Sequence, residues 1–155
     1  MKPAVLILAL ALVAGCGGSS ADKQAKRDFL TQAETICTKT LAERKALQVP
    51  LAMPQVIEYA KKLVAIADRT ATSLLALNVP AADRKELQAK VFQPLQAQVT
   101  VAHGFMTKVL AAQRAQNTTE LQRLFANPPT DTKVDLRWMK RYGFNACVDA
   151  ADTSG

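Results

Sequence analysis

Apolar side chains recur every three or four residues between Val56 and Leu77, and this spacing constrains the fold more than any other feature of the chain. The residues that follow it are Val56, Ala60, Leu63, Ala67, Thr70, Leu74 and Leu77. Such spacing places them on one face of an α-helix, whereas a half-buried strand requires strict alternation of apolar and polar residues. No stretch of the sequence alternates for long enough to predict a convincing strand. The sequence therefore predicts an all-α protein.

The same spacing predicts two further long helices. One is expected from about residue 22 to residue 47. The helix with the apolar spacing described above is expected from residue 54 to about residue 77. The third and longest is expected over residues 80–115. Pro94 lies inside it and removes one backbone hydrogen bond, so we expect a bend or a split near residues 90–94.

Two shorter helices are expected in the last third of the chain. Asn117 should cap a helix that ends at Asn127, and Thr132 with Asp135 should cap a last helix that ends before Gly143. Short connections make consecutive helices antiparallel neighbours, and 155 residues suit one compact core. The expected architecture is an up-down helical bundle of four to five helices, followed by a short tail.

The N-terminus has the pattern of a bacterial lipoprotein signal. Lys2 supplies a positive start, and residues 4–14 form an apolar run that is too short to cross a bilayer. The run leads into Leu12-Val13-Ala14-Gly15-Cys16, which resembles a lipobox. Small residues there allow a signal peptidase to cut before the cysteine, whose thiol takes a diacylglyceryl group. An ordinary secretory signal that ends in a chance cysteine is the alternative.

This pattern divides the chain into three parts. Residues 1–15 are expected to be a cleaved signal peptide, residues 16–22 a flexible tether with a lipidated Cys16, and residues 23–155 a helical bundle domain. Two or more acyl chains on one cysteine give stable anchoring. We therefore expect an extracytoplasmic protein that lipid on Cys16 anchors to the bacterial membrane.

Two cysteines remain once Cys16 is assigned to lipid. Cys37 lies on the apolar face of the first helix, Cys147 lies in the tail, and export from the reducing cytosol favours a bond between them. A loop of about 110 residues gives such a bond roughly 4 to 5 kcal/mol in the chain-entropy model. A redox or metal-binding thiol is the alternative. Because the chain has no Cys-x-x-Cys and no ligand-spaced histidine, we favour the structural Cys37–Cys147 disulfide.

The chain carries twenty Lys and Arg against thirteen Asp and Glu, for a net charge of +7. Two basic clusters are candidate contacts for an anionic surface, namely Lys23, Lys26 and Arg27 after the tether, and Arg137, Lys140 and Arg141 on the last helix. The first would lay its helix along an anionic bilayer. The second, beside Trp138 and Tyr142, would meet an anionic cell-wall polymer or another envelope protein. The alternative is that both are solvated helix faces without a partner. Export argues against nucleic acid.

Signals for catalysis and metal binding are weak. His103 is the only histidine, and neither a nucleophile nor an orienting acid can be assigned to it from the sequence. One histidine without a Glu-x-x-His pair argues against a metal centre. The sequence contains no Gly-rich phosphate loop and no Gly-x-Ser-x-Gly elbow. We therefore expect neither an enzyme nor a cofactor.

Two functions remain open. The first is a non-enzymatic interaction or structural module of the envelope that binds its partner through the basic, aromatic last helix. The second is a carrier of a small hydrophobic ligand. In that case the bend at Pro94 and Gly104 would open an apolar pocket lined by Phe92, Phe105 and Met106.

Three short motifs accompany the lipobox in this chain. They are Ile36-Cys37, Leu74-x-x-Leu77-x-x-Pro80-Ala81-x-Asp83, and the terminal Tyr142-Gly143-Phe144-x-x-Cys147. Together they resemble the small exported α-helical lipoproteins of actinobacteria and related high-GC bacteria, with Pro128-Pro129 as a departure. The resemblance implies the helical fold, the disulfide and the anchoring, and it implies no reaction.

Overall fold

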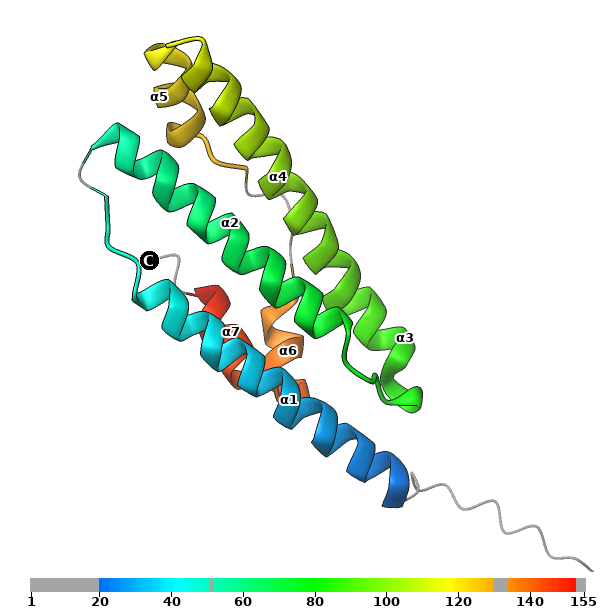
Figure 1. The fold of residues 1–155 in the computed structure, drawn as a ribbon. Helices are drawn as coiled ribbons and strands as arrows, with labels where there is room; N and C mark the ends of the chain where they lie inside the picture. The colour runs from blue at the N-terminus through cyan, green and yellow to red at the C-terminus, as the bar shows by residue number, and fades with distance from the viewer. Residues whose placement is uncertain (1–19, 51, 130–133, 153–155) are drawn as a thin grey trace, which may run out of the picture.

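The structure is a computed structural model, and it describes residues 20–50, 52–129 and 134–152. All regular secondary structure in these residues is helical (Figure 1), so the all-α prediction is confirmed. The predicted signal peptide, Cys16 and Thr132 lie outside the described residues.

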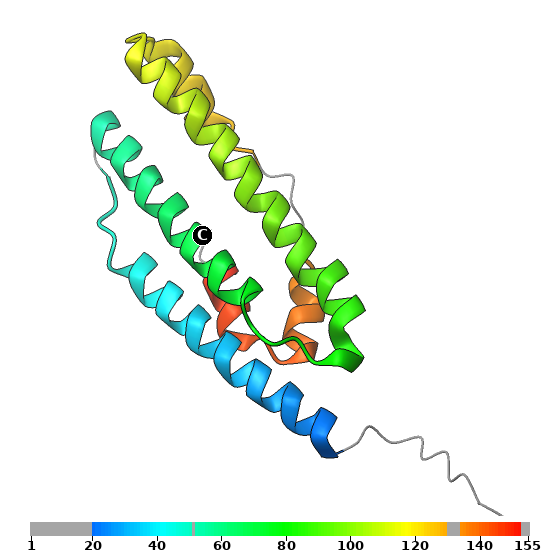
Figure 2. The same cartoon turned by 45° about the vertical axis from the view of Figure 1, so that its right-hand side comes forward.

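Three long helices make up most of the bundle, namely α1 (Ser20–Lys45), α2 (Met53–Leu75) and α4 (Gln93–Arg114). The chain reverses direction between α1 and α2 and again between α2 and α4 (Figures 1 and 2). Helix α2 packs against both α1 and α4. The connection from α2 to α4 consists of a 3-10 turn η1 (Ala81–Asp83), α3 (Arg84–Leu87) and a π-helical turn η2 (Gln88–Phe92).

Three short helices complete the described fold, namely α5 (Thr118–Ala126), α6 (Leu136–Tyr142) and α7 (Asn145–Asp152). Helix α5 folds back onto α4, α7 packs on α1 and α6, and α6 contacts η2. If α3 to α4 are counted as one segment, the described residues hold six helices, one more than the upper limit predicted. The extra helix is α7, so the prediction of a tail after Gly143 is wrong.

Helix α1 starts earlier than predicted. Its first turn contains Ser20, Ala21 and Asp22, so the last three residues assigned to the tether are helical. Alanine has the highest helix propensity, and a carboxylate in the first turn complements the helix dipole. The buried residues of α1 are Phe29, Ala33 and Cys37, which follow each other at four-residue spacing as predicted.

The irregularity expected near Pro94 is present. Residues Gln88–Phe92 form a π-helical turn in which the Gln93 N–H donates to the carbonyl of Gln88, five residues back. Pro94 follows in the first turn of α4, where its missing N–H is tolerated. Gly104 lies inside the same α-helix, where an added Cβ would meet no side chain within 4 Å apart from its two chain neighbours. The chain therefore departs from α-helical geometry just before Pro94 and remains α-helical at Gly104.

Local signals set the ends of the short helices. Asn117 Oδ1 accepts a hydrogen bond from the Glu120 N–H at 2.9 Å, which confirms the predicted cap of α5. Asp135 Oδ1 accepts from the Trp138 N–H at 2.9 Å and caps α6. Gly143 ends α6 with a φ of 118°, and the next N–H, that of Phe144, donates to Met139 O at 3.0 Å. Together with the hydrogen bond from the Gly143 N–H to Lys140 O at 3.2 Å, this bond forms a Schellman motif.

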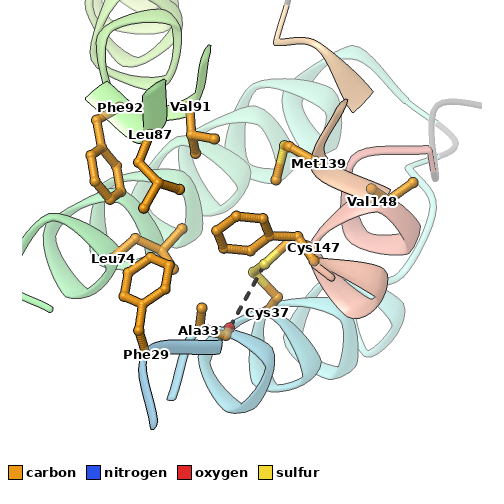
Figure 3. Packing of buried hydrophobic residues seen from close by; sticks show 11 residues of the cluster. Phe29, Ala33, Cys37, Leu74, Leu87, Val91, Phe92, Met139, Cys147 and Val148 are labelled. Atoms are coloured by element: carbon orange, nitrogen blue, oxygen red, sulfur yellow. Dashed lines mark hydrogen bonds between the residues drawn. A yellow bond between two sulfur atoms is a disulfide. The ribbon is translucent and has the colours of Figure 1, made fainter. Parts of the chain in front are cut away.

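The buried side chains form two clusters. The larger joins α1, the end of α2, α3, η2, α6 and α7 (Figure 3). In it the rings of Phe29 and Phe144 pack edge to face with centroids 5.7 Å apart. The smaller joins the first half of α2, the second half of α4 and α5 around Ile57, Val109 and Leu121. Helices α2 and α4 therefore connect two partly separate cores.

Candidate functional site

The predicted disulfide is present and buried in the larger cluster. Cys37 Sγ and Cys147 Sγ are 2.02 Å apart, and Figure 3 shows the bond joining α1 to α7. Two polar contacts reinforce this attachment. Glu34 Oε2 accepts from the Ala146 N–H at 2.8 Å at the start of α7, and the Arg44 guanidinium donates to the Ala150 carbonyl near its end. Helix α7 is thus attached to α1 along its length.

A cavity of about 360 Å³ lies beside the disulfide, between α1, α2, α4, α6 and α7. Most of its lining is apolar, including Cys37, Leu63, Ala67, Leu95, Ala102 and Cys147. Among the described residues the polar side chains of the lining are Thr40, Arg44, Thr70 and Gln98. The cavity therefore combines an apolar body with a few polar groups, as small-molecule sites usually do.

The two threonines of this cavity are paired. Thr40 Oγ1 and Thr70 Oγ1 are 2.6 Å apart, and each also lies within 3.0 Å of the carbonyl four residues before it. Two hydroxyl hydrogens serve these three contacts, so the pair has no donor left for a ligand. The remaining donors of the polar lining are the guanidinium of Arg44 and the amide of Gln98.

The structure separates the three residues predicted to line a pocket. Phe105 and Met106 line a second cavity of about 280 Å³ between α2, α4 and residues 128–129. Phe92 lies instead in the larger cluster, buried near Leu87 (Figure 3). The two phenylalanines belong to different clusters: Phe92 packs in the larger one, whereas Phe105 packs edge to face on Phe125 of α5 with ring centroids 5.8 Å apart. The central cavity was not predicted, although small residues at Ala67 and Ala102 amid larger ones were a signal for it.

The basic residues of α6 are exposed, but the neighbouring aromatic rings are not free. Arg137, Lys140 and Arg141 are all exposed. In contrast, Trp138 Nε1 donates to Glu86 Oε1 at 2.7 Å, and its ring stacks on that of Tyr142 at 4.8 Å between centroids. Trp138 is thus bonded to α3 and stacked on Tyr142, whereas the exposed side chains of α6 are basic.

Tyr142 connects three parts of the chain. Its hydroxyl donates to Asp83 Oδ2 at 2.5 Å, and Lys26 Nζ lies 3.8 Å above its ring and 3.4 Å from the same carboxylate. Burial raises the pKa of the Tyr142 hydroxyl above its ordinary value, and the bond to Asp83 raises it further. Lys26 therefore makes internal contacts, whereas Lys23 and Arg27 beside it are exposed.

His103 forms a hydrogen bond between the two helices that border both cavities. Its Nε2 lies 2.8 Å from Asp68 Oδ1, and the two side chains are 55% and 37% exposed. The pair links α4 to α2 next to Ala102 and Ala67. The described part of the chain contains no group of three or more His, Cys, Asp or Glu side chains that could hold a metal ion.

Comparisons with protein-family models, with curated proteins and with solved structures find no match to this chain. The resemblance to exported lipoproteins therefore stays a prediction. Within the described ranges, no helix has both the length and the apolar character needed to cross a bilayer.

Proposed function

We propose that this protein is a non-enzymatic, lipid-anchored envelope protein that carries a small apolar ligand in the central cavity. The observation that supports this proposal is the cavity of about 360 Å³ between five helices. Its volume lies within the roughly 300–1,000 Å³ that small-molecule sites occupy. The carrier hypothesis is favoured over an aromatic docking surface on α6, because Trp138 and Tyr142 are already engaged within the chain.

The polar lining narrows the chemistry of the ligand. Thr40 and Thr70 use their hydrogens on each other and on backbone carbonyls, so they do not offer donors. Arg44 donates one N–H to the Ala150 carbonyl, and a guanidinium has five. A ligand with a hydrocarbon body and one hydrogen-bond-accepting or anionic group fits this arrangement. Straight-chain fatty acids are the simplest probes of that class.

Binding can be tested by thermal unfolding and calorimetry with fatty acids of increasing chain length. A ligand present at 100 times its Kd should stabilise the protein by about 2.7 kcal/mol, and the effect should peak at one chain length. The matching alcohols should bind more weakly, because they lack the charge that a guanidinium recognises. No stabilisation by any member of the series would contradict the carrier proposal.

A filled cavity provides the specific variant. Ala67→Leu with Ala102→Leu adds side-chain volume to the lining from α2 and α4, and should weaken binding by about tenfold, or about 1.4 kcal/mol. The control is Ala65→Leu with Ala97→Leu, the same changes at exposed positions of the same helices. Equal affinities for the two variants would place the ligand elsewhere.

The anchoring at Cys16 rests on the lipobox pattern and needs its own test. The mature chain should begin at Cys16, carry acyl chains on it and stay in the membrane fraction after a high-salt wash. Cys16→Ser should abolish the lipid modification. A mature chain that begins elsewhere and carries no lipid would contradict this part of the proposal.

Contact with another envelope protein or an anionic wall polymer through α6 is a second candidate. It is favoured by the exposure of Arg137, Lys140 and Arg141. Reversing these three charges should weaken capture of the partner sharply. Unchanged capture would remove this surface from consideration.

A further inference from the structure

The position of α1 limits how far the folded bundle can move from a lipid anchor. Ser20, the first helical residue, follows Cys16 by four positions, and an extended chain spans at most about 3.5 Å per residue. The start of α1 therefore lies within about 14 Å of a lipidated cysteine. This distance is comparable to the Debye length of roughly 8–10 Å at physiological salt.

Two other segments meet α1 at this end of the bundle. Lys26 bonds Asp83 of η1 and covers the ring of Tyr142 at the end of α6. Both views place the first turns of α1 and helix α3 toward the same end, opposite α5 (Figures 1 and 2). Exposed basic side chains accompany these contacts, namely Lys23, Arg27, Arg84, Lys85, Lys140 and Arg141.

Charge is concentrated at this end. Segments 20–28, 81–90 and 135–142 together contain nine Lys and Arg against five Asp and Glu, a net charge of +4. The other described residues contain nine Lys and Arg against seven Asp and Glu. Their net charge of +2 is spread over more than three times as many residues. Four of the five acidic residues bond groups within the fold, namely Asp28, Asp83, Glu86 and Asp135. Asp83 and Asp135 also pair with Lys26 and Lys90, which leaves seven other basic residues in these segments. The basic residues therefore dominate the outward charge.

We propose that this basic end of the bundle, formed by the start of α1, by η1 with α3, and by the end of α6, rests on an anionic lipid bilayer. The proposal depends on the anchor at Cys16. This orientation differs from one in which α1 lies flat on the membrane. Phe29, Ala33 and Cys37 of α1 face the core, and Lys26 is held by Asp83 and Tyr142. Each basic residue near an anionic surface contributes about 1 kcal/mol, and salt screens the attraction.

Lysine acetylation on vesicles tests the orientation. The lipidated protein is placed in vesicles of phosphatidylcholine alone or with phosphatidylglycerol, and treated with a water-soluble acetylating reagent. Lys23, Lys85 and Lys140 should react about threefold more slowly on the anionic vesicles at low salt, and the difference should disappear at high salt. Lys45 and Lys108, exposed elsewhere on the bundle, should react equally on both.

The same mass spectra separate the two proposals. The peptide that starts at Cys16 reports whether the lipid is present, which tests the anchor alone. A lipidated protein whose lysines react equally on both vesicles would overturn the orientation while leaving the anchor intact. Protection that appears only when a soluble anionic wall polymer is added would also overturn it, in favour of the polymer.

Charge reversal provides a further check. Arg27→Glu with Arg84→Glu removes two of the basic side chains and keeps the reporter lysines, and it should abolish most of the protection. Lys62→Glu with Arg114→Glu causes the same change in net charge at exposed positions elsewhere and should preserve it. Equal loss of lysine protection in both variants would indicate a general effect of net charge and would overturn the proposed contact.

Discussion

Gly143 shows how one residue decides the end of a helix. Its φ of 118° lies in the region that favours glycine, and a Cβ there would lie 3.1 Å from Leu30 Cδ1. Gly143→Ala should therefore destabilise the protein by about 2 kcal/mol in chemical denaturation.

The control for this prediction is the other glycine within the described helices. Gly104 is exposed in α4, and a Cβ there would meet no atom within 4 Å. Gly104→Ala should stabilise the protein by roughly 0.5–1 kcal/mol. If the free energy of unfolding changes with the same sign in both variants, the conformational argument for Gly143 is refuted.

Tyr142 should make stability depend on alkaline pH. Because burial raises the pKa of its hydroxyl, the folded chain keeps this proton above about pH 10, where the unfolded chain loses it. The folded state then binds more protons, so stability falls as pH rises. Denaturation from pH 9 to 11 should show a smaller decline for Tyr142→Phe than for the unchanged protein. The control Tyr59→Phe keeps Tyr142 and should keep the full decline.

At the scale of elements, α7 depends on tertiary contacts. It has eight residues, and isolated helices shorter than about 12 residues are marginal in water. The disulfide, Glu34 and Arg44 together attach it to α1. Its helical structure therefore follows from its position in the bundle.

Removing the disulfide tests this dependence. Cys37→Ala with Cys147→Ala should lower the free energy of unfolding by roughly 4 kcal/mol, because the bond closes a loop across a sequence separation of 110 residues. Amide exchange should speed up most in residues 145–152. Reduction of the unchanged protein should have a similar effect. If α7 stays as protected as α1, packing and the Glu34 contact are sufficient to hold it.

At the scale of the whole molecule, the two core clusters predict two regions of different stability. Leu121→Ala in the smaller cluster should speed amide exchange in α5 and the end of α4, with α1, α6 and α7 little affected. Phe29→Ala in the larger cluster should cost about 3–5 kcal/mol and speed exchange in both regions, because α2 and α4 lose their support. If Leu121→Ala speeds amide exchange equally in all described helices, the two clusters form a single cooperative core.

The sequence alone was sufficient for much of the fold. The three long helices follow from apolar spacing, and the ends at Asn117, Asp135 and Gly143 follow from side-chain and backbone chemistry within a few residues. The Cys37–Cys147 bond was predictable because only two cysteines remained after the lipobox. Each of these features depends on local spacing or on a small set of possible partners.

The tertiary structure decided which helix faces meet. Three features join residues from 35 to 116 positions apart: the attachment of α7 to α1, the contacts of Lys26 with Asp83 and Tyr142, and the cavity beside Ala67 and Ala102. Spacing along one helix determines which residues share a face, but it does not determine the partner of that face or the space left between them. That space is set by the packing of five helices, and for this reason the expected pocket at Phe92 lay in the wrong place.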